Sequence, residues 1–552
     1  MCNVPLSAKR VSVPNSIAAD CGELHWSANE PPAFTADAIA AIVAQPRETA
    51  YVVRDPASGA IGVGLGGRLQ AAPQQGAWPL IGSLPPLYPE WLGDRGFAQV
   101  HGTRFAYVGG AMANGIASTQ MVIALARAGC LGFFGAAGLS IGRVAAAIDE
   151  LQRALDGDRL PWGSNLIHSP SEPAHEEAVV DLYLSRGVRL VEASAYLRLT
   201  QAVVRYACSG LSRAADGSVL RHNRVIAKIS RSEVARQFLQ PAPQALLDKL
   251  LARGLLSAQE VELAAHIPLV EDLTCESDSG GHTDNRPLSA LLPEIARLRT
   301  QIASERAYPC AIRIGAAGGL GTPAALAAAF ALGADYVLTG SVNQACVEAG
   351  LGAAARALLA QADMADVAMA PAADMFEMGV NVQVLRRGTL FAARARKLYE
   401  LYRSYPALDA IPAEDREKVE SGMLRASFEQ AWQSTRSFWL GRDPAQVERA
   451  DRDPKHQMAL VFRSYLGLAS RWAIDGIDGR QSDYQIWCGP AMGAFNGWVK
   501  GSFLDELAAR SVLQVALNLL EGAAVLTRAQ QLRSYGLAVP ASAFDYRPRM
   551  LA

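Results

Sequence analysis

One glycine-rich segment, residues 311–341, constrains the fold of this chain more than any other. It reads AIRIGAAGGLGTPAALAAAFALGADYVLTGS. The β-branched residues Ile312 and Ile314 favour a first strand, and the glycines that follow let the backbone turn tightly and approach a ligand closely. Thr322 suits the N-cap of a helix, and a second strand at 336–338 runs directly into Thr-Gly-Ser. The segment therefore predicts strand, turn, helix and strand in succession.

Two successive strand ends in this segment carry small residues that suit an anion. Gly318 and Gly319 follow the first strand, and Gly340 and Ser341 follow the second. Backbone N–H groups and a helix N-terminus favour a bound phosphate, and the loops after strands 7 and 8 of a TIM barrel are the usual place for one. Glycines between a strand and its helix can also serve packing alone. A phosphate site is therefore expected here if the rest of the chain supplies six more strands.

The chain from residue 105 onward alternates short apolar strands with helices. Six strands are predicted before the glycine-rich segment, at residues 105–108, 131–134, 164–167, 190–193, 225–229 and 269–275. With the two strands of that segment the count is eight. This count favours an α/β fold of the TIM (β/α)8 barrel class over an open doubly wound sheet.

Changes in composition along the chain predict three regions. Residues 1–100, rich in proline and glycine, form a small β-rich N-terminal module; residues 101–400 form the barrel with an insertion after strand 8; residues 401–552 form a mainly helical C-terminal domain. Glycines at 62, 64 and 67 satisfy G-x-G-x-x-G, but prolines break the sequence that follows. We therefore expect no dinucleotide-binding helix there.

Charge and cysteine usage restrict the partners and the compartment. The 552 residues include 52 Lys and Arg against 53 Asp and Glu, a net charge of −1, without a long basic run. Nucleic acid and an anionic membrane surface are therefore not expected as main partners. The 8 cysteines are scattered singly without the clustering of a metal site, the N-terminus lacks the apolar block of a signal peptide, and charges interrupt the apolar windows. We expect a cytoplasmic protein without a membrane span or a metal.

Residues at the ends of the predicted strands form the candidate active site, because a TIM barrel carries its chemistry there. Asn114 follows the first strand, Asn165 lies on the third, Lys228 lies within the apolar fifth strand, and His282 follows two glycines after the sixth. Lys228 is either paired with a structural carboxylate or turned toward a ligand, and its apolar neighbours favour the second interpretation. A buried ammonium needs an anion, which an electron-rich flavin ring would provide. His282 on its own could be a structural histidine.

Several strings in these loops resemble a known family. GGH after strand 6, AAGG after strand 7 and TGS after strand 8 resemble the FMN-dependent barrel shared by nitronate monooxygenases and FabK-type enoyl reductases. The longer strings SDSGGHTDNRP, ADMADVAMAPAADMFEMGVNVQVL and QIWCGPAMGAFNGW are more similar to the PfaD type, the trans-acting enoyl reductases of polyunsaturated fatty acid and trans-acyltransferase polyketide synthases. The resemblance implies FMN and NADPH as cofactors and an enoyl thioester on an acyl carrier protein as substrate. A homodimer is also compatible with the resemblance.

The resemblance also assigns roles to residues. The residues that it places on the FMN phosphate are Gly318, Gly319, Gly340 and Ser341. The residues that it places along the flavin ring and the ribityl chain are Met112, Asn114, Asn165 and Lys228, with Gly280 and Gly281 beside them. His282 matches the active-site histidine of the family and is the candidate acid or the donor to the thioester carbonyl. Lys228 is the second catalytic candidate, since an ammonium near the ring would favour the anionic reduced flavin.

One rival function remains open, and two others are less favoured. A nitronate monooxygenase would share the barrel and FMN but use oxygen and a nitronate. A non-catalytic scaffold within a synthase would need neither His282 nor Lys228. A relative of IMP dehydrogenase would share the phosphate turns, but Cys275 lies before the GGH turn and not within a glycine-rich nucleophile loop.

The C-terminal region carries three further expectations. Its aromatic residues with the spacing of helical core positions are Phe428, Trp432, Phe438 and Trp439. The segment 484–498 contains glycines and a proline, and we expect it to be a loop that covers the site or the acyl channel. The basic residues that could meet an acidic carrier protein, or could form a solvated helix face, are Arg386, Arg387, Arg394, Arg396 and Lys397.

Overall fold

The computed structural model describes residues 24–71, 74–170 and 172–552. The chain divides into two compact units, Met1–Tyr88 with Ala524–Tyr546 and Pro89–Ala523 with Arg547–Ala552. The smaller unit therefore draws on both the N-terminal and the C-terminal parts of the sequence. The expectation about a signal peptide concerns residues 1–23, which lie outside the described residues.

The smaller unit contains a five-stranded sheet of order β3-β2-β5-β1-β4. Its strands are β1 (His25–Ser27), β2 (Ala50–Arg54), β3 (Ile61–Leu65), β4 (Arg68–Gln70) and β5 (Trp78–Leu84), accompanied by the helix α1 (Ala36–Val43). Gly62 and Gly64 of the G-x-G-x-x-G motif lie within β3, where an added Cβ would meet the rings of Phe34 and Trp26 at 2.5 and 2.2 Å. These glycines therefore make room for aromatic side chains and do not begin a nucleotide-binding helix.

The larger unit is built on a closed barrel of eight parallel strands, as predicted, in the order β12-β13-β15-β16-β6-β7-β8-β9. In chain order these strands are β6 (Tyr107–Gly109), β7 (Leu131–Phe134), β8 (Gly163–Ile167), β9 (Leu190–Ser194), β12 (Arg224–Ile229), β13 (Asp272–Glu276), β15 (Arg313–Ala317) and β16 (Tyr336–Thr339). The glycine-rich segment supplies β15 and β16, and β16 closes the barrel by pairing with β6. The (β/α)8 prediction is confirmed.

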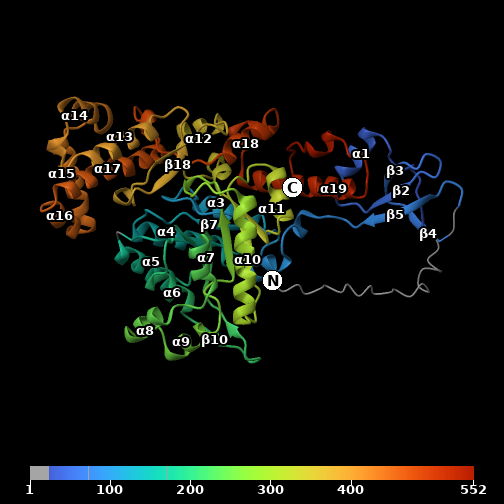
Figure 1. Cartoon of the computed structure of the whole chain (residues 1–552), viewed down its shortest axis with the longest axis horizontal. Coiled ribbons are helices and arrows are strands. Elements are labelled where there is room, and N and C mark those ends of the chain that lie inside the picture. Colours follow the sequence, from blue (N-terminus) through green and yellow to red (C-terminus); the bar gives the residue numbers. More distant parts are fainter. Residues whose placement is uncertain (1–23, 72–73, 171) are drawn as a thin grey trace, which may run out of the picture. The chain divides into compact units, whose positions relative to one another are not determined.

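Helices surround the barrel, and all except α2, which precedes β6, come after a barrel strand in the chain (Figure 1). They are α2 (Arg95–His101), α3 (Thr119–Arg127), α4 (Ile141–Leu155), α5 (Pro173–Arg186), α6 (Gln201–Cys208), α7 (Ser232–Leu239), α8 (Gln244–Ala252), α9 (Ala258–Ala264), α10 (Leu288–Arg306), α11 (Pro323–Ala331) and α12 (Ala353–Ala360). Thr322 caps α11 as expected, because its side chain accepts a hydrogen bond from the N–H of Ala325.

A buried ion cluster lies at the N-terminal ends of the barrel strands. Arg313, the only charge in its strand, donates to both carboxylate oxygens of Asp272 at 2.6 and 2.8 Å. His101 contacts the same carboxylate through Nε2 at 3.0 Å. Burial alone would raise the pKa of Asp272, but His101 and Arg313 lower it. This end of a barrel serves stability, so the charge in β15 is structural.

The insertion after strand 8 contains a small sheet that the sequence analysis did not predict. Strands β17 (Val367–Pro371) and β18 (Asn381–Leu385) form an antiparallel hairpin, and β18 also pairs with the two-residue strand β14 (Gly281–His282). The register places His282 opposite Val382. The GGH turn is therefore held by a segment that lies far from it in the sequence.

The chain after the inserted sheet is mainly helical, in line with the predicted helical region. They are α13 (Phe391–Ser404), α14 (Ala413–Val419), α15 (Phe428–Arg442), α16 (Pro444–Ala450), α17 (Pro454–Asp475), α18 (Ala491–Val499) and α19 (Val512–Ser534), and α19 continues into the smaller unit. In Figure 1 the helices α13 to α17 form a group of their own. Within the described residues, one helix, Val512–Ser534, is long and apolar enough to cross a membrane, and 83% of its apolar window is buried in the protein.

Two expectations about this region need correction. Phe428, Trp432 and Trp439 are buried, but Phe438 is 55% exposed and does not belong to the core. The segment 484–498 is a loop only in its first half, because α18 begins at Ala491. Gly493 lies within that helix, where an added Cβ would come 2.0 Å from the backbone N of Met364. This glycine allows close packing and does not signal a loop.

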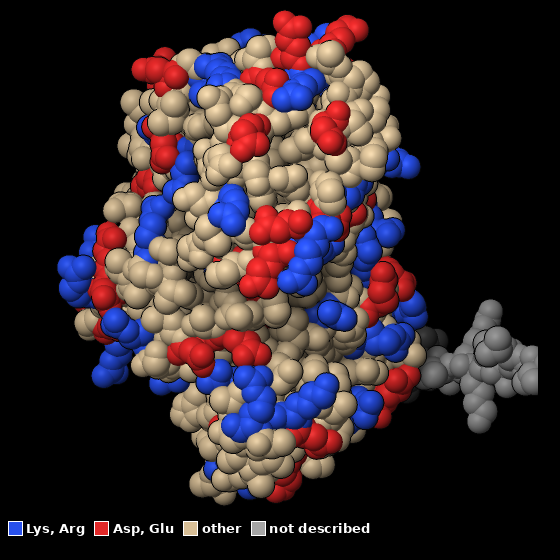
Figure 2. Space-filling model, turned by 90° about the vertical axis from the view of Figure 1, so that its left-hand side faces the viewer, with Lys and Arg blue, Asp and Glu red and all other residues tan. Residues whose placement is uncertain are grey.

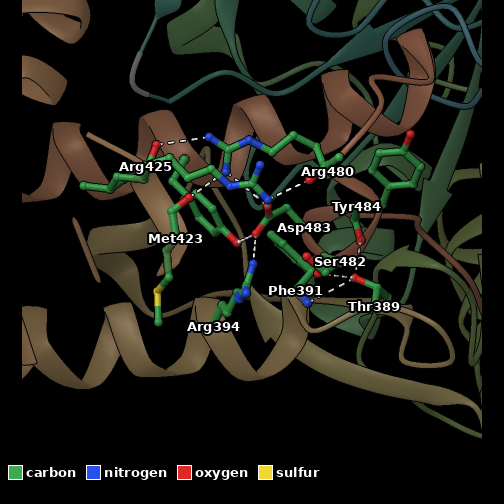
Figure 3. A network of polar contacts seen from close by, with 12 residues as sticks. Thr389, Phe391, Arg394, Met423, Arg425, Arg480, Ser482, Asp483 and Tyr484 are labelled. Carbon is green, nitrogen blue, oxygen red and sulfur yellow. Dashed lines mark hydrogen bonds and ion pairs between the residues drawn. The ribbon is translucent and has the colours of Figure 1, made fainter. Parts of the chain in front are cut away.

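Asp483 joins the two ends of the helical group (Figure 3). Its carboxylate is fully buried; it accepts from Tyr465 Oη at 2.7 Å and from Arg480 at 3.1 Å and also binds Arg394. The guanidinium of Arg425 lies 3.6 Å from Oδ2 of the same carboxylate. Arg394 precedes the helices α14 to α17 in the chain and Arg480 follows them. One carboxylate therefore fastens the start and the end of this helical group to each other.

Candidate functional site

A cavity of about 680 Å³ lies at the C-terminal ends of the barrel strands. All the predicted site residues line it: Met112, Asn114, Asn165, Lys228, Gly280, Gly281, His282, Gly318, Gly319, Gly340 and Ser341. These residues come from the ends of six different strands and are far apart in the sequence. Their assembly into one cavity is an observation, and the role of each residue stays a prediction.

The two glycine turns after β15 and β16 leave open space at the cavity. An added Cβ at Gly319 or Gly340 would meet no atom within 4 Å. Gly319 has a φ of +70°, which favours glycine, and α11 begins a few residues further on. Gly318 differs, because its added Cβ would lie 2.5 Å from Ser277 Oγ, so this glycine lets two loops approach each other. Open glycine turns beside a helix N-terminus are the kind of place where a phosphate can bind.

Lys228 of β12 lies between two carboxylates from the neighbouring strands β9 and β13. Its Nζ is 3.3 Å from Glu192 Oε1 and 3.2 Å from Glu276 Oε1. Burial alone would lower the pKa of Lys228, but the two carboxylates outweigh it, and the pKa lies above its usual value. The ammonium therefore already has its counter-ions. A flavin ring is therefore not needed as its anion, and the expectation that Lys228 favours an anionic reduced flavin stays a prediction.

Residues at the ends of β6, β7 and β8 make close contacts with neighbouring segments. Asn165 donates to the carbonyl oxygen of Glu192 at 3.0 Å and to Ser194 Oγ at 3.1 Å. Asn114 has a φ of +58° and donates to Ser470 Oγ of α17 at 3.5 Å. The carbonyl oxygen of Met112 would lie 1.8 Å from a Cβ added at residue 135, which explains the glycine there. These contacts fix one wall of the cavity.

His282 is paired with a carboxylate from the inserted hairpin. Its Nε2 is 3.3 Å from Oδ1 of Asp374, which lies in the loop between β17 and β18. Burial alone would lower the pKa of His282, but Asp374 outweighs it and the pKa is raised; Glu276 raises it further and Lys228 opposes the shift. Burial alone would raise the pKa of Asp374, but His282 lowers it. The pair therefore favours a protonated imidazole beside the cavity.

Backbone packing around the GGH turn also comes from distant segments. A Cβ added at Gly280 would lie 2.8 Å from the backbone N of Cys488. The N–H of Gly489 donates to Ser341 Oγ at 3.1 Å, and the side chain of Gln344 donates to the carbonyl oxygen of Trp487. The first part of the segment 484–498 therefore lies at the site, as expected.

Sequence reasoning missed three carboxylates, Glu192, Glu276 and Asp374. Glu192 is the single charge in its strand, and the parallel register pairs it with Ile226, two positions before Lys228 and on the same face of β12. Glu276 ends β13, shortly before the glycines of the GGH turn. Asp374 carried no comparable signal, because its partner lies 92 positions away and the hairpin that brings it there was not predicted.

Two family models match the sequence. The nitronate monooxygenase family matches residues 98–427, and the inserted helical domain of acyl-carrier-protein S-malonyltransferases matches residues 405–484. The first match covers more than half of the chain. The fold and the site thus define a (β/α)8 barrel of the nitronate monooxygenase family, a family of oxidoreductases.

Similar proteins and structures assign the chain to a smaller group within this family. One of the subunits of a polyunsaturated fatty acid synthase from Thraustochytrium sp. is 47% identical over 467 residues, which are 83% of this chain and 31% of that protein. The polyketide biosynthesis protein PksE of Bacillus subtilis is 44% identical over 446 residues, 81% of this chain and 58% of that protein. The crystal structure of the enoyl reductase domain of MlnA, from the macrolactin biosynthesis cluster of Bacillus amyloliquefaciens, is 36% identical with a TM-score of 0.77, and the match covers 81% of this chain and 99% of that one.

Within the nitronate monooxygenase family, this chain belongs to the PfaD-type enoyl reductases, the group that its sequence resembles. The chain spans less than two thirds of the length of either of these two biosynthetic proteins.

Proposed function

We propose that this protein is an FMN-dependent enoyl reductase that acts in trans. It reduces the α,β double bond of an enoyl thioester on an acyl carrier protein with NADPH, during polyketide or polyunsaturated fatty acid biosynthesis. The observation that carries the proposal is the single cavity in which His282, Lys228 and two open glycine turns meet. The likeness to the enoyl reductase domain of MlnA supports it.

The residues of the cavity fit FMN. The turns at Gly319 and Gly340 have space and N–H groups for its phosphate, and Asn114 and Asn165 lie where amides could meet the ribityl chain or the ring. Bound FMN would supply the transfer of two electrons from NADPH to the enoyl group. The protein itself has to orient the thioester, exclude water and provide the proton.

His282 is the best-placed residue to donate the proton to the substrate. Asp374 holds Nε2, so that Nδ1 is the nitrogen left to donate, either to the α-carbon of the substrate or to the thioester carbonyl. Lys228 is held by Glu192 and Glu276, and the three groups together carry a net charge of one carboxylate. Lys228 would bind and orient a carbonyl edge through its remaining N–H.

The test uses the purified full chain loaded with FMN. We expect oxidation of NADPH when the enzyme receives an enoyl thioester on a carrier protein or on pantetheine. Replacing His282 with Ala should leave FMN bound but slow the reoxidation of reduced flavin by the enoyl substrate about 10²- to 10⁴-fold. Unchanged reoxidation would remove His282 from the mechanism.

A nitronate monooxygenase is the second candidate, because the family model of that name matches residues 98–427. Oxygen consumption with a nitronate, together with no oxidation of NADPH by enoyl thioesters, would favour this activity. The His282→Ala variant would then be examined with the nitronate.

A further inference from the structure

One wall of the cavity is formed by two helices of the helical group. The residues of α15 that line it are Ser434, Thr435, Phe438, Trp439 and Arg442. The residues of α17 that line it are Arg463, Ser464, Leu466, Gly467, Leu468, Ser470 and Arg471. The helices also contact each other directly. The strand ends therefore supply one side of the cavity and a separate pair of helices supplies the other.

The cavity-lining residues of α17 form a stripe that leads outward. Ser464, Leu468 and Arg471 are spaced by four and three residues, which places them on one face of the helix. Exposure rises along this stripe, since Ser464 is half-buried, Leu468 is 46% exposed and Arg471 is exposed. Phe438 of α15, the aromatic residue that does not join the core, is 55% exposed and lines the same cavity. The stripe thus runs from the half-buried Ser464 to the exposed Arg471, with the exposed apolar side chains of Leu468 and Phe438 along it.

Arg471 differs from the other cations of the cavity. Four Lys or Arg residues line it within the described part of the chain, and three have carboxylate partners. Lys228 has Glu192 and Glu276, Arg442 is bound by Glu172 at 3.0 Å, and Arg463 by Glu377 at 3.2 Å. For Arg471 the structure gives no hydrogen bond or ion pair among the residues that it describes. This guanidinium is available to an anion that enters the cavity from outside.

We propose that α15 and α17 form the entrance channel for the phosphopantetheine arm of a carrier protein, and that Arg471 binds the phosphodiester of that arm. The inference rests on the proposed function. An arm held in this way has its phosphate at the exposed end of the stripe and passes its methyl and methylene groups between Phe438 and Leu468. The thioester then reaches the strand ends, where His282 lies.

The charge of the channel favours this occupant over NADPH. A phosphodiester carries one negative charge, which one free arginine matches. NADPH carries a pyrophosphate and a further phosphate, which would call for several free cations, and the described lining offers one. The phosphate of FMN has its own expected place at the turns after β15 and β16, on other elements than α17.

The test compares substrates with and without the phosphate. The same enoyl group is offered on a holo carrier protein, on phosphopantetheine and on pantetheine without phosphate. Arg471→Ala should raise the KM for the two phosphorylated substrates about tenfold and Arg471→Glu should raise it more. The KM for the pantetheine thioester and for NADPH should stay within about twofold, and kcat with saturating substrate should be unchanged.

A matched control is Arg436→Ala, since Arg436 lies on α15 but does not line the cavity. It should change none of these constants. The inference fails if Arg471→Ala leaves every KM unchanged, if it affects the phosphate-free thioester equally, or if it raises the KM for NADPH instead. If the wild-type enzyme reduces no enoyl thioester, the proposed function fails first, which is a different result.

Discussion

The contact between His282 and Asp374 shows how one residue can tune another across a long stretch of chain. Asp374 lies 92 positions after His282 and reaches it because the hairpin β17 to β18 pairs with the GGH turn. The charged groups that face His282 are Asp374 from the hairpin, Glu276 from β13 and Lys228 from β12. Burial and the ammonium lower the pKa of His282, but the carboxylates outweigh both, and the pKa is raised.

This arrangement predicts a shift in pH dependence. If protonated His282 is the donor, activity is present below its pKa and is lost as pH rises through it. Asp374→Asn removes the charge that raises this pKa, so the fall in rate at high pH should begin at a lower pH. The rate of flavin reoxidation by an enoyl thioester, followed against pH, measures the shift.

The control for this prediction is Asp415→Asn, which removes a carboxylate of α14 that pairs with Lys397 and does not line the cavity. Its pH profile should match that of the wild type. Asp374→Glu should restore much of the wild-type profile. A profile of Asp374→Asn that coincides with the wild type would show that this carboxylate does not set the charge of His282.

The turns after β15 and β16 allow a direct test of the phosphate site. Gly340 has no left-handed φ and open space where a side chain would begin, so Gly340→Ala should fold normally. Its methyl group would occupy the space expected for phosphate, and FMN should bind roughly 10- to 100-fold more weakly. Titration of the apoprotein with FMN measures this. Gly142→Ala on α4, which also meets open space, should bind FMN as the wild type does.

The Asp483 network makes the helical group depend on one buried carboxylate. Asp483→Ala leaves the arginines at 394, 425 and 480 facing one another without it, and we expect the free energy of unfolding to fall by about 3–5 kcal/mol. Urea denaturation followed by tryptophan fluorescence checks this value. Asp478→Ala, at an exposed carboxylate of the same loop, should change stability by less than about 0.5 kcal/mol. Equal stability of both variants would contradict a structural role for the network.

The barrel could be predicted from sequence because each strand is a short apolar run that ends in a turn signal. The inserted sheet could not be predicted in this way, because β14 has only two residues and is a strand only through its pairing with β18. Glycines were misleading in α18, where Gly493 serves packing against Met364. Phe438 has the spacing of a core residue but lies beside a cavity that no local pattern reveals. The strand-end residues were predictable, whereas their carboxylate partners depend on tertiary contacts.

At the scale of the whole molecule, 52 Lys and Arg nearly balance 53 Asp and Glu. Figure 2 shows acidic and basic residues interspersed on the face that it presents, without a large area of one sign. The basic residues considered for carrier docking have internal partners: Arg394 binds Asp483, Arg387 binds Asp366, Lys397 binds Asp415, and Arg386 and Arg396 donate to backbone carbonyls. Docking of a carrier protein through these basic residues alone is thus less favoured than recognition of its phosphopantetheine arm.

The smaller unit combines an N-terminal and a C-terminal segment of the chain, and this affects how it forms during synthesis in the cell. Arg528 is buried and donates to the carbonyl oxygens of Leu84 at 3.3 Å and Pro46 at 3.1 Å, and it is made 444 residues after Leu84. At ~5–20 residues per second, the N-terminal strands wait roughly 20–90 s for that partner on the ribosome. Throughout this time the carbonyl groups of Pro46 and Leu84 lack this buried donor. Expression trials that shorten the C-terminus would therefore harm the part of the protein that is translated first.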